Sequence, residues 1–192
     1  VGQKDQFSRT GLYVGGTSLF YGTDILLGAF ERLNETKGLN IRLILVCREG
    51  EGDELLLPYA GRPWLEVIHA SGDEALEPIY RRSDFGIFSG RRDPYMDFSM
   101  PVKLFEYLSR ALPIVTTDCV EAANFVEKNG VGIVAQDNPQ SFAEAVAGLY
   151  DDPDCLPRLR KNAERALRGG NLWVHRAERA AQEIMQSRNL RS

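Results

Sequence analysis

The sequence predicts an α/β protein whose parallel sheet is covered by helices on both faces. Short apolar runs alternate with amphipathic segments along the chain, which is the pattern of repeated strand–helix units. One run, Ile41–Cys47, is almost continuously apolar, as expected for a strand buried on both faces. No Ser- or Pro-rich linker interrupts the 192 residues, so we expect a single domain over residues 1–192.

Six short strands are expected. The first, Leu12–Val14, enters a tight turn at Gly15 and Gly16. The others cover residues 41–47, 65–70, 85–88, 113–117 and 131–135. Right-handed crossovers would connect these strands into one sheet.

Helices are expected between and after the strands, where apolar residues recur at helical spacing. Their ranges are 23–37, 51–59, 74–82, 121–129, 139–150, 156–167 and 173–186, with one more after Pro101. Gly38 and Gly130 are the expected stops of two of them, and Asn138 before Pro139 is an expected helix start. Residues 89–99 are expected to form an irregular loop.

The stretch from Asp97 to Leu108 predicts a loop that leads into a helix. Ser99 is the expected cap, and Pro101 suits the first turn, where a missing N–H costs nothing. Helical spacing divides the residues that follow into two faces. The apolar face carries Val102, Phe105, Leu108 and Leu112, and the polar face carries Lys103, Glu106 and Arg110.

This helix start has two interpretations. In the first, its free N–H groups and dipole attract an anion, Lys103 meets a phosphate and Glu106 accepts hydrogen bonds from sugar hydroxyls. In the second, it is a capped amphipathic helix with an ordinary ion pair between residues three apart.

Composition and charge exclude several classes of protein. The net charge of -4 argues against general nucleic-acid binding, which needs a basic surface. No apolar run approaches the roughly 18 residues of a membrane span, and the polar first ten residues predict no signal peptide. Cys47, Cys119 and Cys155 lie far apart, without metal-ligand spacing, so we expect reduced thiols, a cytoplasmic protein and no metal site.

Ligands of such sheets bind beyond the carboxyl ends of the strands, which directs attention to loops 15–21, 48–52, 71–73, 89–100 and 117–122. Gly15 and Gly16 would let the backbone approach a ligand closely, or they would form a turn and nothing more. Arg91 and Arg92 suit phosphate oxygens, or belong to a solvated loop of mixed charge. The side chains of Thr116, Thr117 and Asp118 would face a ligand or, as we favour, cap the next helix.

Familiar motifs of catalysis are missing. The double glycine is not the GxGxxG of a dinucleotide site, and no GxxxxGK[ST] of a phosphate-loop ATPase occurs. No Ser–His–Asp set and no HExxH is present either.

Several segments together resemble the C-terminal domain of group 1 glycosyltransferases. They are LYVGG, GTDILLGAFERL, IRLILVC, LEVIHASGDEALEPIYRRSDFGIFSG, FSMPVKLFEYLSRALPIVTTD, GVGIVAQDNPQSFAEAVAGLYDD and NLWVHRAERAAQEI. The resemblance covers residues 11–185 and is most specific from Ser99 to Asp118. It implies a Rossmann-like domain that forms one half of an enzyme with the two-domain GT-B fold. The Trp173 helix resembles the family's closing helix, or Trp173 is simply a core aromatic.

The resemblance also implies a donor site for a nucleotide-diphosphate sugar, UDP- or GDP-linked. Glu106 would bind the ribose, and loop 70–72 would lie beside the base. The diphosphate would face Gly15, Gly16, Lys103 and the amides of Ser99, Met100 and Val102. No cofactor is expected beyond this donor substrate.

Two departures from the family pattern accompany the resemblance. Many members carry Glu-x7-Glu, whose first glutamate would fall at Phe98; either the neighbouring Asp97 substitutes as the catalytic candidate, or a Met-Pro-x-Lys loop takes its place. Many members also hold the diphosphate with a basic pair in the first loops, which here carry no basic residue. Arg91 or Arg48 would then supplement Lys103.

The chain is about half the length of a full enzyme of this fold, so we expect the N-terminal acceptor-binding domain to be missing and the isolated domain to be inactive. The parent enzyme would serve glycan or polysaccharide synthesis, in the cytoplasm or at the membrane periphery. Two alternatives stay open: the donor half of a sugar-nucleotide 2-epimerase, and a non-catalytic α/β interaction module.

Overall fold

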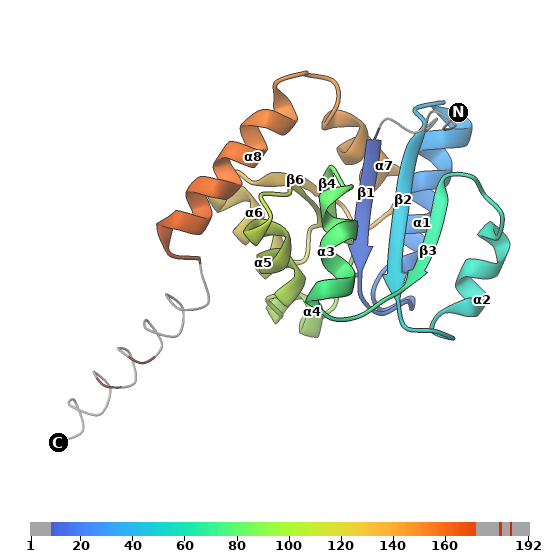
Figure 1. Ribbon diagram of the computed structural model, residues 1–192, viewed down its shortest axis with the longest axis horizontal. Coiled ribbons are helices and arrows are strands. Elements are labelled where there is room, and N and C mark those ends of the chain that lie inside the picture. The colour runs from blue at the N-terminus through green and yellow to red at the C-terminus, as the bar shows by residue number, and fades with distance from the viewer. Residues whose placement is uncertain (1–8, 172–180, 182–184, 186–192) are drawn as a thin grey trace.

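The computed structural model describes residues 9–171, 181 and 185, and its six strands form one parallel sheet (Figure 1). The spatial order is β3-β2-β1-β4-β5-β6, which confirms the predicted α/β architecture. The strands are β1 (Arg9–Val14), β2 (Ile41–Cys47), β3 (Leu65–His69), β4 (Phe85–Phe88), β5 (Ile114–Thr117) and β6 (Gly132–Ala135). Each expected strand is present to within a few residues at its ends.

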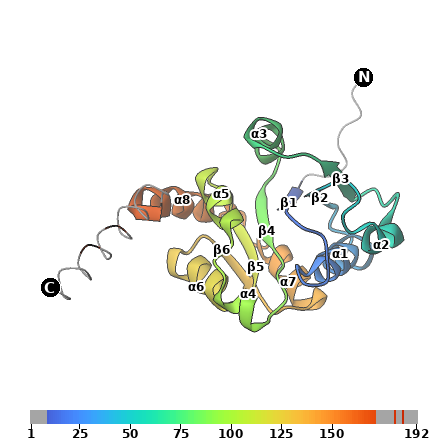
Figure 2. The ribbon, with the colours of Figure 1, turned by 90° about the horizontal axis from the view of Figure 1, so that it is seen from below.

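Helices cover both faces of this sheet, and Figure 2 shows α3 and α5 on one side with α1 and α7 on the other. The α-helices are α1 (Thr23–Glu31), α2 (Asp53–Leu56), α3 (Asp73–Arg81), α4 (Pro94–Phe98), α5 (Val102–Ser109), α6 (Val120–Asn129), α7 (Pro139–Gly148) and α8 (Cys155–Ala166). Short irregular turns extend α1, α2 and α8 as η1 (Arg32–Thr36), η2 (Leu57–Tyr59) and η3 (Leu167–Asn171). No helix in the described part of the chain is both long and apolar enough to cross a membrane.

Most helix boundaries follow the local signals in the sequence. The Asn138 side chain accepts a hydrogen bond from the Ser141 amide at 2.9 Å and starts α7, as predicted. Gly130 ends α6 in the left-handed conformation, also as predicted. The helix predicted over residues 173–186 lies almost entirely outside the described residues.

The segment 89–99 is not the irregular loop that the sequence predicted, because it contains the short helix α4. The Asp93 carboxylate accepts a hydrogen bond from the Met96 amide at 2.8 Å, and Pro94 occupies the first helical position. A side-chain cap followed by proline is a helix start that the sequence already carried.

The order in which the strands are added to the sheet reverses between its two central strands, β1 and β4. These strands pair only at Gly11–Phe85 and Leu12–Gly86, whereas β1 pairs with β2 along its whole length. Beyond the pairing, the hydroxyl of Tyr107 on α5 accepts a hydrogen bond from the Val14 amide at 3.2 Å. The same hydroxyl donates to the Ile87 carbonyl at 3.1 Å. One buried tyrosine therefore spans the gap where the two strands diverge.

Gly86 makes room for this tyrosine. A Cβ atom at Gly86 would lie 2.3 to 2.6 Å from three atoms of the Tyr107 ring. The ring cannot withdraw easily, since it is fully buried and its hydroxyl is bonded on both sides. The absence of a side chain at this strand position is thus a packing requirement.

We expect Gly86→Ala to destabilise the fold by about 1–3 kcal/mol, because the added methyl overpacks a fixed aromatic ring. Urea denaturation of both proteins measures the difference. Gly148→Ala in α7 is the control, since its new Cβ would meet nothing nearer than 3.8 Å. This control should be neutral or stabilising by up to about 1 kcal/mol. Equal losses in the two variants would contradict the packing argument.

Candidate functional site

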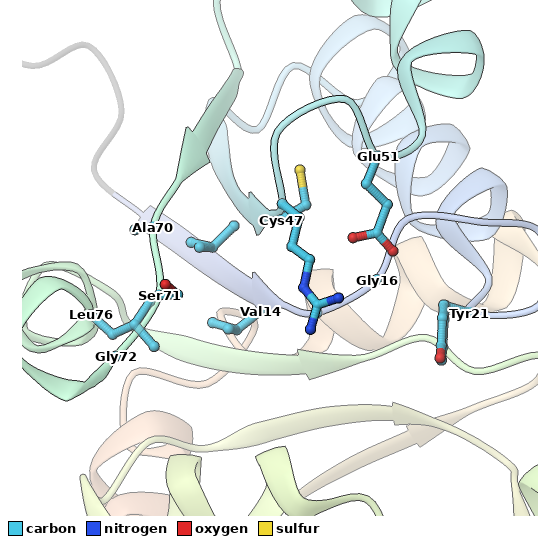
Figure 3. A pocket seen from close by; sticks show the side chains of 12 residues that line it. Val14, Gly16, Tyr21, Cys47, Glu51, Ala70, Ser71, Gly72 and Leu76 are labelled. Atoms are coloured by element: carbon cyan, nitrogen blue, oxygen red, sulfur yellow. The ribbon is translucent and has the colours of Figure 1, made fainter.

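A pocket of about 360 Å³ opens at the carboxyl ends of three neighbouring strands, β1, β2 and β3 (Figure 3). This is the edge of a parallel sheet where ligands bind, next to the point at which the strand order reverses. Three of the five loops predicted from the sequence meet here: 15–21, 48–52 and 71–73. The lining residues are Val14, Gly15, Gly16, Tyr21, Val46, Cys47, Arg48, Glu51, Ala70, Ser71, Gly72 and Leu76.

The glycine turn after β1 forms one wall of this pocket. Gly15 has a φ of +151°, which side-chain-bearing residues rarely adopt, and its amide donates to the Val46 carbonyl at 2.9 Å. A Cβ at Gly15 would lie 2.5 Å from the Lys103 ammonium nitrogen. Both the backbone angle and the close approach of Lys103 therefore favour glycine at this position.

Hydrogen bonds fix the shape of the turn from two sides. The Tyr13 hydroxyl donates to the Gly16 carbonyl at 2.6 Å. The Thr17 hydroxyl donates to the Glu51 carbonyl at 2.6 Å, and the Thr17 amide donates to the Glu51 carboxylate at 3.3 Å. In Figure 3 the Glu51 carboxylate points toward Gly16. The first two strand loops are thereby held against each other.

Lys103 is a partly buried cation that lies over aromatic rings. Its ammonium nitrogen is 4.1 Å from the centre of the Tyr13 ring and 5.8 Å from that of Phe88. Among the described residues, no carboxylate lies within ion-pair distance of it. Burial lowers the pKa of Lys103 from 10.5 to about 8, and the more distant Glu106 carboxylate partly opposes this shift.

This position of Lys103 corrects two expectations drawn from helical spacing. The side chain does not lie with Glu106 on an exposed polar face; it reaches under the glycine turn. No ion pair joins Lys103 to Glu106 in the described part of the chain, so the interpretation as an ordinary surface pair is wrong. The reason is that α5 begins at the edge of the sheet, directly beside the end of β1.

The predicted apolar face of α5 is also partly wrong. Phe105 and Leu108 are buried, but Val102 is 54% exposed because α5 starts at the rim of the sheet. Leu112 is buried although the helix ends at Ser109. The side chains of α5 that are buried are Leu104, Phe105, Tyr107 and Leu108.

Glu106 is held by a tyrosine rather than by a lysine. Its carboxylate accepts a hydrogen bond from the Tyr80 hydroxyl at 3.0 Å. Burial, followed by the charge of Glu106, raises the pKa of Tyr80. The carboxylate is therefore oriented by a neutral donor and keeps free acceptor capacity.

The amides before α5 divide into two groups. Ser99 does not cap α5, contrary to the prediction: its amide and hydroxyl both donate to the Tyr95 carbonyl, at 2.9 and 2.7 Å, and so complete α4. Pro101 stands at the cap position instead. The amides of Met100 and Val102 have no hydrogen-bond partner among the described residues, so they remain able to bind an anion.

The Asp97 carboxylate is engaged in hydrogen bonds to neighbouring parts of the chain. Its carboxylate accepts two hydrogen bonds from the Arg92 guanidinium, at 3.1 and 2.9 Å. It also accepts one from the Val120 amide at 3.3 Å, at the start of α6. The Arg92 hydrogen bond is the main reason that the pKa of Asp97 is lowered. Asp97 thus joins α4 to α6, and its catalytic role stays a prediction.

The other expected side chains of loops 89–100 and 117–122 are also engaged. Arg91 forms an ion pair with Asp24 at 2.5 Å and does not line the pocket. The Thr117 hydroxyl donates to the Gly90 carbonyl at 2.6 Å. It does not cap α6, whose cap residue is Cys119, so that prediction is wrong. The three cysteines are buried free thiols.

Sequence reasoning missed the aromatic residues that complete the site. The Lys103 ammonium lies over the Tyr13 ring in a cation–π contact, and the Tyr80 hydroxyl donates a hydrogen bond to Glu106. The Tyr107 hydroxyl bridges the diverging strands. A signal existed for Tyr107, because it stands four residues after Lys103 and therefore one turn along the same side of α5. No local pattern joins Tyr13 or Tyr80 to α5.

The family described as "Glycosyl transferases group 1" matches residues 8–152, well over half of the chain. The chain belongs to the group 1 glycosyltransferases. The resemblance drawn from the sequence is thereby confirmed. No curated protein matches the chain.

Solved structures share the fold of this glycosyltransferase domain. Sucrose-phosphate synthase from Thermosynechococcus elongatus has a TM-score of 0.77 at 16% identity, over 95% of this chain and 46% of that one. The C-terminal domain of a group 1 glycosyl transferase from Francisella tularensis has a TM-score of 0.67 at 12% identity, over 86% of this chain and 87% of that one. The pneumococcal O-GlcNAc transferase in complex with UDP and GlcNAc has a TM-score of 0.71 at 15% identity, over 95% of this chain and 36% of that one.

These matches establish the fold as that of a GT-B glycosyltransferase domain. The chain spans 46% of the sucrose-phosphate synthase and 36% of the pneumococcal enzyme. It therefore corresponds to less than half the length of those two proteins.

The buried charge of Lys103 should appear in the pH dependence of stability. The pKa of about 8 in the folded chain lies below the ordinary value of 10.5, so the folded state disfavours the proton. At pH 7 we expect Lys103→Met to exceed the wild type in stability by on the order of 1–3 kcal/mol. As pH rises from 8 to 10.5 the unfolded wild type binds more protons than the folded one, so its stability rises and the difference closes.

Urea denaturation of both proteins at intervals from pH 7 to 10.5 measures this. Lys161→Met is the matched control, because Lys161 is exposed on α8. A difference between Lys103→Met and wild type that stays constant with pH would contradict the buried-charge assignment.

Proposed function

We propose that this chain is the donor-binding domain of a glycosyltransferase that transfers a sugar from a nucleoside-diphosphate sugar, UDP- or GDP-linked, to an acceptor. The proposal rests on the position of Lys103. This cation has no carboxylate partner among the described residues, and it lies directly beside the Gly15 backbone at the pocket. A desolvated cation beside a glycine turn is an arrangement suited to a phosphate group.

The donor would extend across the edge of the sheet. Its diphosphate would lie between the Gly15–Gly16 turn, Lys103 and the free amides of Met100 and Val102. Its ribose hydroxyls would donate to Glu106, three residues after Lys103 on α5. The base would occupy the pocket beside loop 70–72, which presents backbone groups and the exposed Ser71 side chain.

In the proposed reaction, the bond between the anomeric carbon and the diphosphate oxygen breaks. The electron pair of that bond passes to the leaving diphosphate. The acceptor oxygen forms the new bond to the anomeric carbon, and its proton passes to the departing diphosphate. Lys103 and the helix amides would stabilise the charge that develops on the leaving group. We propose that the domain uses no cofactor beyond the donor substrate, since these groups supply the positive charge.

The relatives support this proposal in two respects. The pneumococcal transferase is described in complex with UDP and GlcNAc, which supports a nucleoside-diphosphate ligand for this fold. The Francisella tularensis match is to a C-terminal domain, which supports a C-terminal position for this one. An N-terminal domain of the parent enzyme would then bind the acceptor and complete the water-excluding cleft, and the isolated chain would transfer nothing.

We propose a cytoplasmic enzyme of glycan or polysaccharide synthesis. Three buried free thiols support a reducing compartment.

Calorimetric titration of the chain with UDP, GDP and ADP tests the proposal. We expect one nucleotide to bind. Lys103→Ala and Glu106→Ala should each weaken that binding by about tenfold or more, because each removes a charge-assisted hydrogen bond.

Lys161→Ala is the control, since this exposed lysine of α8 lines no part of the pocket. It should leave the affinity unchanged. Absence of binding to the folded chain at millimolar nucleotide would contradict the proposal, as would equal effects of Lys103→Ala and Lys161→Ala.

A further inference from the structure

Tyr80 on α3 is the hydrogen-bond donor that the described structure provides for the Glu106 carboxylate. Its hydroxyl lies 3.0 Å from one carboxylate oxygen, Oε2. The Tyr80 side chain is 2% exposed, whereas Glu106 lies at the partly exposed surface of α5. The bond therefore joins a buried donor in one helix to an accessible acceptor in another.

The Tyr80 ring is itself held on two sides. The Arg110 guanidinium lies over the ring, 3.9 Å from its centre, and the Tyr107 ring meets it edge to face with centres 6.2 Å apart. Arg110 is in turn bonded to the Glu77 carboxylate at 3.1 Å and to the Glu106 carbonyl at 3.2 Å. Because the ring is fixed in this way, its hydroxyl has a fixed position beside Glu106.

Tyr80 also lies on the side of α3 that borders the pocket. Leu76, four residues earlier on α3, is one of the residues that line it. Residues four apart lie on the same side of a helix, so the α3 face that borders the pocket continues to Tyr80 and from there to Glu106.

A glutamate on a helix surface has several rotatable bonds and ordinarily samples several rotamers. We infer that Tyr80 is a positioning residue for ribose recognition: it holds Glu106 Oε2 so that the remaining acceptor sites of the carboxylate meet the ribose hydroxyls. This inference rests on the proposed donor site. The inference predicts that the site binds ribonucleotides in preference to 2′-deoxyribonucleotides. This preference would depend on Tyr80, although Tyr80 itself does not contact the nucleotide.

The consequence is a specific coupling between Tyr80 and the 2′-hydroxyl. With the carboxylate held in place, a 2′-deoxyribose leaves an oriented acceptor without its donor, which lowers affinity. Without the Tyr80 hydroxyl, the carboxylate turns freely and loses much of that preference. A tyrosine with a merely structural role would change both affinities equally.

The test is calorimetric titration of the 192-residue chain with UDP, GDP and ADP and with their 2′-deoxy counterparts. We expect Tyr80→Phe to weaken binding of the preferred ribonucleotide by about five- to tenfold, the equivalent of one hydrogen bond. Its effect on the deoxy counterpart should be less than twofold. In the Glu106→Ala background, Tyr80→Phe should change neither affinity.

Tyr150→Phe is the matched control, because the buried Tyr150 hydroxyl has no hydrogen-bond partner among the residues that the structure describes. Tyr150 packs edge to face on Phe85, and no described contact joins it to Glu106. This variant should leave both affinities unchanged. Thermal unfolding of each variant verifies that the titrated protein is folded.

The possible outcomes separate the two claims. Loss of binding in Glu106→Ala with no selective effect of Tyr80→Phe would overturn the positioning role and leave the proposed function intact. Equal loss for ribo- and deoxyribonucleotide in Tyr80→Phe would also overturn it. Absence of nucleotide binding to the folded wild-type chain would overturn the proposed function and this inference with it.

Discussion

The divergence of β1 and β4 is the constraint on which the rest of the site depends. Parallel strands that separate leave backbone N–H and C=O groups without partners, and such groups are costly when buried. The Tyr107 hydroxyl supplies the missing partner on both strands: it accepts a hydrogen bond from the Val14 amide and donates one to the Ile87 carbonyl. Gly86 provides the space for its ring. The opening at the end of the sheet is therefore a fixed feature of the fold.

Helix α5 links this divergence of the strands to the charged side chains beside the pocket. Lys103, Glu106 and Tyr107 are separated by three and one residues, so one rigid helix fixes the distance between a cation, a carboxylate and the point at which the strands divide. The Lys103 ammonium lies against Gly15 and over the Tyr13 ring. The Glu106 carboxylate accepts a hydrogen bond from Tyr80 on α3. Neither charge is neutralised by the other. Both remain available to a ligand that offers an anion and hydroxyl donors.

Two charged side chains of loop 89–100, Arg91 and Asp97, already have partners of opposite charge. Asp97 is bonded to Arg92 and to the start of α6, and Arg91 is paired with Asp24. These contacts join neighbouring loops to one another and so keep the edge of the sheet in shape. Lys103 lacks such a carboxylate partner among the described residues and lies beside the pocket. The charges that join loops are thus separated in space from Lys103, which we propose binds the ligand.

The fold class, the six strands and the loops that border the pocket can be predicted from the amino-acid sequence, because apolar periodicity, glycines and helix caps are local signals. Asn138 starts α7 and Gly130 ends α6 for that reason, and the loops of Gly15, Arg48 and Ser71 follow directly from the predicted strands. The tertiary structure decided what each polar side chain contacts. Ser99 completes α4 rather than capping α5, Lys103 turns under a glycine, and Glu106 is bonded to Tyr80 from another helix. Helical spacing describes which side of one element a residue occupies, whereas burial and partners depend on the elements that pack against it. Those contacts join residues far apart in the chain, and no local pattern encodes them.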